Sequence, residues 1–480
     1  MNKTGNSVAE LMEERTLIER NIQQNIESQT QRWSPLKFGL LGVREAARKD
    51  KKQQFTSLFH HITPTLLRDS FYELKKNAAA GIDGVSWQDY EARIDSNIYD
   101  LHERLHAKKY QPKPAKRITI PKSDGSERPI SIQSVEDKIV QQAVVHVLNA
   151  IYENDFLGFS YGFRPERSQH NALDALYVGI NQRKVNWILD MDLEKFFDRV
   201  EHDWLIHFIE HRVADQRLIK LVIQWITAGH MDEHGHRVKA NRGCPQGSVI
   251  SPLLANIYLH YVMDCWTEGR RRENHADMII VRYADDTVLG FQYEEQARHY
   301  YEQLQLQLGQ YGLSVNVKKT RLIEFGRYAA QNRAKRNLGK PETFSFLGFT
   351  HYCSQTRAGR FQIGRKTISK SINKKLKEID VELRKRMHRP VWETAQWLKS
   401  VVRGHINYFG VPGNFCAMAK FRDEVIKRWL KALRRRSQRH KMPWSKFTRL
   451  VAIWIPLAQI VHPYPNRRFH VNTRSRSRMH

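Results

Sequence analysis

Two short apolar runs with acidic residues between them give the clearest local pattern in the chain. Residues 278–282 and 287–291 are rich in Ile, Val, Leu and Phe, and Tyr283-Ala284-Asp285-Asp286 joins them. Two β-rich runs joined by a short polar segment predict a β-hairpin, here with both carboxylates at its tip. Because Asp is also a common turn residue, a plain polar turn is the competing interpretation.

A second buried strand is predicted over residues 185–193, again with acids where it ends. Asp190 and Asp192 lie near that end. We expect Asp192 to lie opposite the hairpin tip, so that carboxylates from both segments share one site. Asp192 can alternatively cap a helix over residues 193–200, and capping would not exclude a catalytic role.

Helical spacing of apolar residues dominates much of the remaining chain. Residues 1–75 look helical, residues 135–152 give a strong amphipathic stripe, and residues 250–265 predict a long apolar helix. A loop with Gly and Pro at residues 241–247 leads into that last helix. Glycine permits a close backbone approach to a ligand, and Gln246 is the polar group available there.

A basic hairpin and a further strand complete the predicted β elements. Residues 116–132 indicate two strands joined by a polar loop, with Lys122 and Arg128 able to project onto one site. Cations that face a carboxylate site suit a triphosphate, and two exposed surface cations are the competing interpretation. Residues 311–320 predict a turn and then a strand that ends in Lys.

Positive charge is concentrated toward the C-terminus. The 480-residue chain has a formal net charge of +29, and residues 351–480 carry 31 Lys and Arg against 6 Asp and Glu. An apolar stripe of helical spacing runs from Ile368 to Leu383, with lysines and arginines over much of the remaining surface. This basic third indicates a polyanion-binding module. Tyr408 and Trp429 are candidate stacking surfaces, with burial in a core as the competing role.

Composition also bears on several classes of protein. The four cysteines form no CxxC pair, so we expect neither a zinc knuckle nor a disulfide framework, and a reducing cytosol fits. The polar N-terminal residues lack the apolar segment of a signal peptide. The longest apolar run, residues 451–461, is too short to span a bilayer and contains Pro456. We therefore expect a folded cytoplasmic protein with no membrane contact.

The carboxylates at the two predicted strand ends suit nucleotidyl transfer. Asp192 and Asp285 together can hold two Mg²⁺ ions about 3.5–4 Å apart, the usual spacing for in-line displacement at phosphorus. Mg²⁺ is a hard cation that prefers carboxylates and substrate phosphates. The expected reaction is attack of a 3′-hydroxyl on a nucleoside triphosphate, with pyrophosphate as the leaving group.

The order of these segments resembles the reverse transcriptases encoded by bacterial group II introns, the intron-encoded maturases. The runs that carry the likeness are SYGFRP at residues 160–165, CPQGSVISPLLAN at 244–256, VRYADD at 281–286 and FLGF at 346–349. The likeness covers roughly residues 40–470.

This resemblance implies an α+β fold of the right-hand polymerase type. Fingers and palm, built with an antiparallel sheet, precede an α-helical thumb or maturase domain. The implied boundaries are a helical N-terminal extension at 1–75, fingers and palm at 76–355, the thumb at 356–462 and a basic tail at 463–480.

Motif matching also implies roles for single residues. Asp192, Asp285 and Asp286 resemble the catalytic acids, and the metal site would add the backbone carbonyl of Leu193. The ions would be two Mg²⁺, with Mn²⁺ as a substitute. The nucleotide-binding positions would be Lys122 and Arg128 at the triphosphate, Phe197 as a gate against a ribose 2′-hydroxyl, Gln246 beside the incoming nucleotide, and Lys319 as general acid.

The C-terminal part resembles a domain that contacts intron RNA, with RGHINYF at residues 403–409 as its signature. The candidate RNA-binding residues are Lys374, Lys375, Arg403, Arg434, Arg435 and Arg436. The implied partners are group II intron RNA, an RNA template with a DNA primer, dNTPs and target DNA. The implied location is the bacterial nucleoid or a ribonucleoprotein particle.

Departures from the family pattern leave alternatives open. Relatives often carry Thr-Pro-Gln-Gly-Gly where Cys244 and Ser248 are the outer residues here, and neither change removes a charge. Many relatives end in a Cys- and His-containing endonuclease, which we do not expect in this chain, so we do not expect it to cut a second DNA strand. The alternatives are a domesticated reverse transcriptase in host defence and a splicing factor with a vestigial polymerase site. The sequence does not indicate an oligomeric state.

Overall fold

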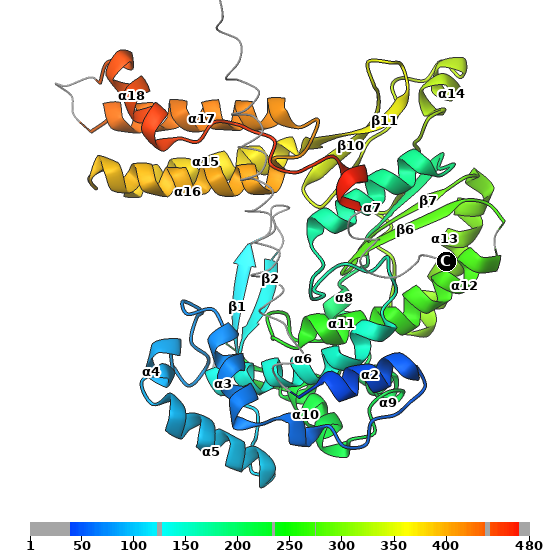
Figure 1. Ribbon diagram of the computed structural model, residues 1–480, viewed down its shortest axis with the longest axis vertical. Helices are drawn as coiled ribbons and strands as arrows, with labels where there is room; N and C mark the ends of the chain where they lie inside the picture. The colour runs from blue at the N-terminus through cyan, green and yellow to red at the C-terminus, as the bar shows by residue number, and fades with distance from the viewer. Residues whose placement is uncertain (1–38, 122–126, 233–235, 274, 437–441, 470–480) are drawn as a thin grey trace, which may run out of the picture.

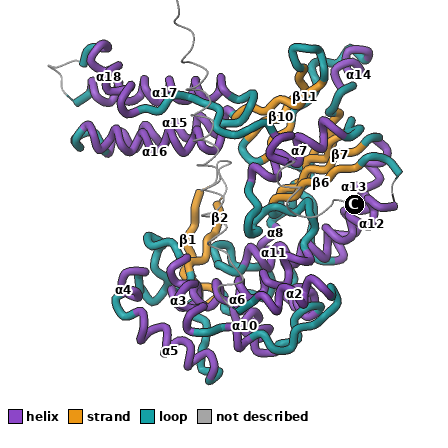
Figure 2. Tube along the Cα trace, in the orientation of Figure 1, coloured by secondary structure: helices purple, strands orange, loops and turns teal. Residues whose placement is uncertain are grey.

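The computed structural model describes residues 39–121, 127–232, 236–273, 275–436 and 442–469. Helices from the N-terminal part lie at one end of the molecule and a C-terminal helical bundle at the other, with a central sheet between them (Figure 1). Within these residues, the strands are grouped in three separate sheets (Figure 2).

The helices of the N-terminal part pack around α6 (Val135–Asp155). This helix is buried on almost every side, because apolar residues extend well beyond a single stripe. The Ser134 side chain caps it by accepting a hydrogen bond from the Asp137 amide. The other helices here are α2 (Leu41–Lys49), the 3₁₀ turn η2 (Phe59–His61), α3 (Pro64–Glu73), α4 (Trp87–Glu91) and α5 (Ile94–His106).

A small sheet with the order β2-β1-β4-β5 extends from this part toward the bundle (Figure 1). β1 and β2 are antiparallel, with Ile118 opposite Ile130 and Ile120 opposite Arg128. This pairing agrees with the basic hairpin expected over residues 116–132. The strands are β1 (Ala115–Pro121), β2 (Glu127–Ile132), β4 (His230–Met231) and β5 (Arg237–Val238).

The central sheet has the order β6-β7-β3-β8 and is antiparallel throughout. Its strands are β3 (Trp187–Met191), β6 (Met278–Tyr283), β7 (Asp286–Phe291) and β8 (Arg321–Glu324). Successive side chains along a strand point to opposite faces of the sheet, so two apolar clusters form. Leu189 and Met191 pack on one face, and Ile188 and Val288 pack on the other.

Helices cover both faces of the central sheet and connect its strands. The long helix expected over residues 250–265 is interrupted by a π-helical segment, η3, so that α11 and α12 flank it. The helices are α7 (Gln169–Gln182), α8 (Phe196–Arg199), α9 (His202–Glu210), α10 (Gln216–Thr227), α11 (Ser251–Leu259), η3 (His260–Asp264), α12 (Cys265–Glu273) and α13 (Glu294–Gln310).

A third sheet, β11-β10-β9, links the central sheet to the bundle. Leu347 and Gly348 join β9 to β10 with φ values of 46° and 79°. Two successive positive φ values are typical of a tight type I′ hairpin turn. The elements of this part are α14 (Ala329–Lys335), β9 (Phe344–Phe346), β10 (Phe349–Gln355) and β11 (Phe361–Thr367).

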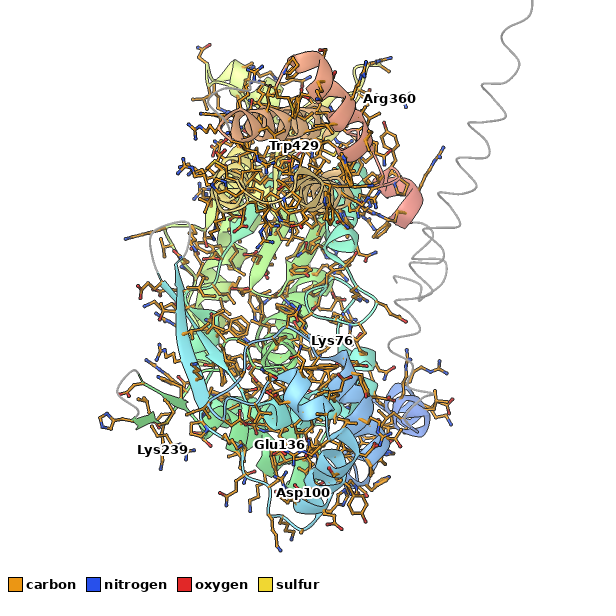
Figure 3. All side chains as sticks on the ribbon, turned by 90° about the vertical axis from the view of Figure 1, so that its left-hand side faces the viewer. Lys76, Asp100, Glu136, Lys239, Arg360 and Trp429 are labelled. Atoms are coloured by element: carbon orange, nitrogen blue, oxygen red, sulfur yellow. The ribbon has the colours of Figure 1, made fainter. Side chains whose placement is uncertain are left out.

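The C-terminal bundle has an apolar core of its own. It consists of α15 (Ser369–Lys385), α16 (Val391–Phe409), α17 (Phe415–Arg434) and α18 (Trp444–Trp454). Trp429 lies inside it (Figure 3) and is 0% exposed, so it is a core residue rather than a stacking surface. Within the described ranges, no helix is both long and apolar enough to cross a membrane.

The structure agrees with the expected α+β class and corrects two local predictions. Asp192 does not cap a helix, because α8 begins at Phe196 and the residue before it is Lys195. Residues 311–320 form no regular strand: only Val315 bridges to Leu193, and Lys319 lies in a turn. The domain boundaries inferred from the resemblance stay a prediction.

Candidate active site

The acidic hairpin tip and the end of β3 lie side by side in the central sheet. β6 and β7 pair up to Tyr283 opposite Asp286, which leaves Ala284 and Asp285 in the turn. β3 pairs with β7 up to Met191 opposite Thr287, so the next residue, Asp192, follows directly beside Asp286. Both acidic segments therefore lie at the same end of neighbouring strands in the sheet.

Asp192 is held by neighbours from a distant part of the chain. Its Oδ2 accepts a hydrogen bond from Asn316 Nδ2 at 3.2 Å and lies 3.2 Å from Lys319 Nζ. Its backbone oxygen accepts a hydrogen bond from the Asn316 amide at 2.8 Å. Its backbone amide donates to Thr320 Oγ1 at 3.3 Å. These contacts fix the carboxylate's position, because both its backbone and its side chain are tied to residues 316–320.

The pKa of Asp286, at the hairpin tip, is strongly shifted. Its pKa is raised to about 7, first by loss of hydration and then by the negative charges of Asp285, Asp192 and Asp190. The Lys319 ammonium opposes this effect. Desolvation and like charges both favour the protonated carboxyl group, and the like charges are the firmer cause because Asp286 itself is exposed at the surface.

This crowding of negative charge suits a divalent cation. In the part of the chain that the structure describes, no three His, Cys, Asp or Glu side chains are arranged to hold a metal ion by themselves. Mg²⁺ sites in nucleotide-processing enzymes commonly use one or two carboxylates and complete the shell with water and substrate phosphates. The carboxylates of Asp192, Asp285 and Asp286 therefore fit as partial ligands.

A buried arginine supports the backbone of the hairpin tip. Arg282 is 0% exposed and donates to the Ala284 carbonyl at 3.0 Å. Ala284 has a φ of 58°, a conformation that L residues rarely adopt. Gly162 lies against the same turn, because a Cβ at that position would come within 2.4 Å of the Ala284 nitrogen. The turn is thus held from two sides.

The charge of Arg282 is neutralised inside the protein. Its Nε and Nη2 donate to both oxygens of Asp264 at 2.7 and 2.5 Å, and Asp264 is also 0% exposed. Further bonds reach Asn256 Oδ1 at 3.1 Å and Ser160 Oγ at 2.7 Å. Sequence reasoning gave these residues no role; the available signal was a charged side chain inside an apolar strand and an apolar helix.

The predicted nucleotide-binding residues Phe197 and Gln246 belong to contacting segments. The Phe197 carbonyl accepts a hydrogen bond from the Cys244 amide at 2.7 Å, and the Gln246 carbonyl accepts one from Ser131 in β2 at 2.7 Å. Phe197 is half-buried, whereas the preceding Phe196 is buried in the core. The loop that contains Gln246 therefore connects the basic hairpin with the chain that follows Asp192.

The structure describes the other predicted nucleotide-binding cations only in part. Lys319 lies beside Asp192, with 60% of its side chain exposed. Lys122 lies outside the described residues. The backbone of Arg128 belongs to β2, and its side chain is outside the described part. Leu193 follows Asp192 and bridges to Val315.

The candidate RNA-binding residues divide into two groups along the bundle. Ile372 and Phe421 line one pocket, and Asp380 pairs with Arg428 at 3.2 Å, so α15 and α17 run in parallel. The first group, Lys374, Lys375 and Arg403, is exposed in the half of the bundle nearer the sheets. The second group, Arg434, Arg435 and Arg436, lies at the far end of α17.

Comparison with known proteins finds similarity over part of the chain. Residues 120–351 match the family described as reverse transcriptase (RNA-dependent DNA polymerase). Protein YkfC of Escherichia coli is 38% identical over 201 residues, which are 40% of this chain and 52% of that protein. The group II intron-encoded protein LtrA of Lactococcus lactis is 30% identical over 226 residues, 46% of this chain and 37% of the relative.

One solved structure is similar at lower identity. It is telomerase from Candida albicans in complex with a fragment of telomeric RNA, with 13% identity, a TM-score of 0.39, and coverage of 76% of this chain and 65% of that one. The chain spans about half, or less, of the length of the two curated relatives named above. Residues 120–351, just under half of the chain, are similar to reverse transcriptase domains, and part of the chain is similar to a group II intron-encoded protein.

Proposed function

We propose that this protein is an RNA-directed DNA polymerase encoded by a group II intron, which copies RNA into cDNA and binds its intron RNA to assist splicing and mobility. The observation that carries the polymerase proposal is the placement of Asp192 beside Asp286, at the tip of the hairpin that also contains Asp285. The match of residues 120–351 to reverse transcriptases supports the same reaction.

In this proposal, Asp192 and Asp285 are the principal metal ligands, and Asp286 and the Leu193 carbonyl support them. Two Mg²⁺ ions, or Mn²⁺ as a substitute, would activate the primer 3′-hydroxyl and offset the charge of the triphosphate when bound. Asn316 and Thr320 hold Asp192 in place before any ligand arrives. Lys319 Nζ occupies the position beside Asp192 where positive charge is needed, and its exposed side chain can move aside.

Contacts around the site suggest how a nucleotide is selected and held. We assign the ring of Phe197 to the gate that excludes a ribose 2′-hydroxyl, and Gln246 to the side of the incoming nucleotide. The hydrogen bond from Ser131 to Gln246 links that loop to the basic hairpin of Lys122 and Arg128, the proposed triphosphate cations. Lys319 is the proposed general acid for the leaving pyrophosphate.

The basic bundle supports binding of RNA. Its exposed lysines and arginines suit a phosphate backbone, whose contacts fix orientation without reading sequence. LtrA is named as a group II intron-encoded protein, and this likeness supports the proposal that intron RNA and target DNA are the partners here. A ribonucleoprotein particle in a bacterial cytoplasm is the corresponding location.

Primer extension on an RNA template with a DNA primer, dNTPs and Mg²⁺ tests the reaction. We expect extension by the wild type and a loss of at least about 100-fold for Asp285→Asn, because removing a metal ligand removes several kcal/mol of transition-state stabilisation. Asp203→Asn, an exposed change on α9, is the matched control and should extend normally.

The outcomes separate the polymerase from its rivals. Equal inactivity of the wild type and Asp285→Asn, with intron splicing still promoted, would identify an RNA-binding splicing factor. Equal activity of both would mean that Asp285 has no part in the reaction. The DNA around the gene separates the intron from the defence role: flanking sequence that folds into intron RNA domains supports the first, and its absence supports the second.

A further inference from the structure

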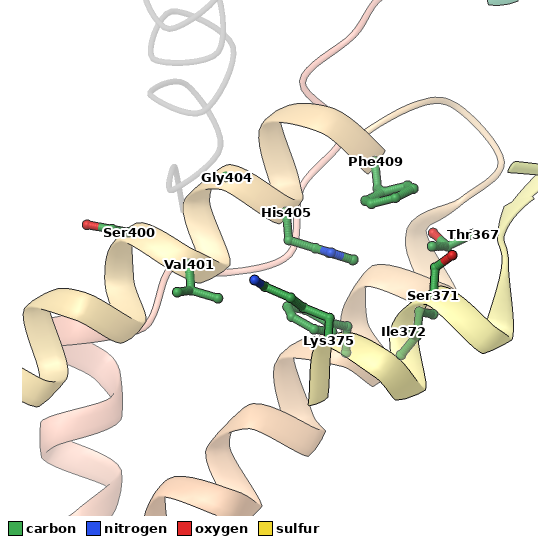
Figure 4. Close-up of a pocket in the computed structure, with 10 residues that line it drawn as sticks. Thr367, Ser371, Ile372, Lys375, Ser400, Val401, Gly404, His405 and Phe409 are labelled. Atoms are coloured by element: carbon green, nitrogen blue, oxygen red, sulfur yellow. The ribbon is translucent and has the colours of Figure 1, made fainter. Parts of the chain in front are cut away.

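A cavity of about 370 Å³ opens in the C-terminal bundle, away from the acidic hairpin. It lies where α15, α16 and α17 converge beside the end of β11 (Figure 4). Its lining residues are Thr367, Ser371, Ile372, Lys375, Ser400, Val401, Gly404, His405, Phe409 and Phe421. The volume is near the lower end of the range for small-molecule pockets, roughly 300–1,000 Å³.

Flat rings and one unsatisfied nitrogen characterise the inner wall. The His405 ring stacks on Phe421, with centroids 3.8 Å apart and planes 19° from parallel, and Phe409 lies 4.6 Å from the same imidazole. Within the described residues, the buried His405 Nε2 has no hydrogen-bond partner. A buried polar atom without a partner is costly; Nε2 has less than 1 Å² of exposed area, so a small rotation of the ring would be needed before an occupant could supply a partner.

His405 is an uncharged group at neutral pH. Burial first, and the nearby Lys375 charge second, lower its pKa to about 4. A neutral imidazole has one donor and one acceptor nitrogen, so it can pair with either an acceptor or a donor on the edge of a planar heterocycle. The wall therefore offers a stacking surface and a directional polar contact together.

One lysine lines the cavity, and others lie near it along α15. Lys375 points toward His405 (Figure 4) and is 49% exposed, and its ion pair with Glu378 at 3.1 Å is equally exposed. Exposed ion pairs contribute little, so Lys375 can turn to another anion. Lys370 and Lys374 are exposed on the same helix. An anionic chain is thus attracted to the entrance of a pocket that is itself mainly apolar.

We propose that this cavity binds one unstacked nucleobase of the RNA held by the bundle, with the flanking phosphates on Lys375 and its neighbours. The inference rests on the proposed RNA binding and adds a defined site to it. Proteins recognise RNA chiefly through bases splayed out of the strand, which stack on aromatic side chains and hydrogen-bond at their edges. The aromatic wall and the unpaired nitrogen of His405 correspond to these two contacts, and Lys375 is available to a flanking phosphate.

Gly404 allows the cavity to be filled without damage to the helix. It lies inside α16, and a Cβ at this position would have nothing within 4 Å. Gly404→Leu therefore places a side chain in or at the opening of the cavity, and loss of a helical glycine favours folding. Gly269→Leu on α12 is the matched control, because its added Cβ also meets nothing within 4 Å and it is remote from the bundle.

Binding of a fluorescent single-stranded RNA oligonucleotide to the full chain provides the first measurement. We expect Gly404→Leu to weaken binding roughly 10-fold, within the range reported for loss of one base-stacking contact, and Gly269→Leu to bind as the wild type does. Photocrosslinking with thiouridine-substituted RNA provides the second, and the crosslinked peptides should include residues 400–409 in the wild type but not in Gly404→Leu.

The results separate this inference from the proposed function. If the wild type binds the RNA and extends primers, but both glycine variants bind equally and crosslink at the same peptides, the nucleobase site is wrong while the polymerase proposal stands. If the wild type does not bind RNA at all, both are wrong. His405→Phe keeps a ring but has no Nε2. If this variant keeps its affinity for RNA and loses its preference among bases, the edge contact is assigned to Nε2. If it loses its affinity for RNA, a stacking role for the ring is contradicted.

Discussion

At the scale of single residues, the candidate site contains several carboxylates close together, and hydrogen bonds hold one of them, Asp192, in position. Asp286 has its pKa raised to about 7 by desolvation and by Asp285, Asp192 and Asp190, while Lys319 opposes them. The acids could be predicted from sequence, because paired carboxylates at strand ends are a local pattern. The groups that hold Asp192 could not, because Asn316 is 124 positions away and has no distinctive local sequence.

Phe197→Ala tests the proposed sugar gate. Removing the ring opens space beside the ribose 2′-position, so we expect the preference for dNTPs over rNTPs to fall by about 10-fold or more. Single-nucleotide incorporation with matched dNTP and rNTP, compared as kcat/KM, measures this. Phe197→Tyr keeps the ring and should keep the preference. An unchanged ratio in the alanine variant would remove Phe197 from this role.

Asp264→Asn tests the buried support of the hairpin. The substitution keeps the shape of the side chain but leaves the charge of Arg282 buried without a counter-ion, which we expect to reduce the free energy of unfolding by about 3–5 kcal/mol. Glu294→Gln is the control, since its exposed pair with Arg298 should contribute less than about 1 kcal/mol. Urea unfolding monitored by circular dichroism measures both; a loss below that of the control would show that the pair is not important.

At the scale of elements, apolar alternation and helical spacing predicted much of the regular structure, and tertiary contacts decided the rest. The hairpin β6–β7 and the helix α6 follow directly from their apolar patterns. Residues 311–320 also alternate, yet Val317 is 70% exposed, and within this segment only Val315 forms a β-bridge. The π-helical η3 was not foreseeable, since one extra residue in a helical turn leaves no mark in a hydrophobic pattern.

The burial of His351 in β10 makes the free energy of unfolding depend on pH. The residue is 0% exposed, and burial first and Arg365 second lower its pKa to about 3. A folded-state pKa below the unfolded value of about 6.5 means that the unfolded chain binds more protons between these values. The stabilisation that depends on neutral His351 is therefore fully present above about pH 6.5 and decreases as the pH falls toward 3.

His351→Phe should remove this dependence while retaining the stacking on Phe344, whose ring centroid lies 4.8 Å away. We expect the drop in unfolding free energy between pH 7 and pH 5 to be smaller in the variant by on the order of 2 kcal/mol. Chemical denaturation at several pH values measures it. Parallel curves for the wild type and the variant would mean that His351 titrates normally in the folded protein.

At the scale of the whole molecule, the positive charge is concentrated in residues 351–480, which include the helices of the bundle. The path of the chain after α18 was not predictable. Val461 and His462 donate to the Gly410 carbonyl at 2.9 and 3.0 Å, and Arg468 Nη2 donates to Asp174 in α7 at 2.9 Å. Arg468 and Asp174 are 294 positions apart, so only the assembled fold brings this pair together.

The far end of the bundle gives a test of its proposed contact with RNA. Arg434→Ala removes one cation, and we expect weaker binding of all RNA sequences and a decrease of about 0.7 in the slope of log affinity against log salt. Arg93→Ala, an exposed arginine at the opposite end of the molecule, should leave both quantities unchanged. Titrations at several salt concentrations measure them; an unaltered slope in Arg434→Ala would exclude a phosphate contact there.

The central claim is that carboxylates from β3 and from the β6–β7 hairpin share a pair of divalent ions. Anomalous diffraction from crystals containing Mn²⁺, a primed RNA template and a non-hydrolysable dNTP analogue tests it most directly. We predict two peaks about 3.5–4 Å apart, both within bonding distance of Asp192 or Asp285. A nucleotide bound at the site with no anomalous peak touching either carboxylate would contradict the account.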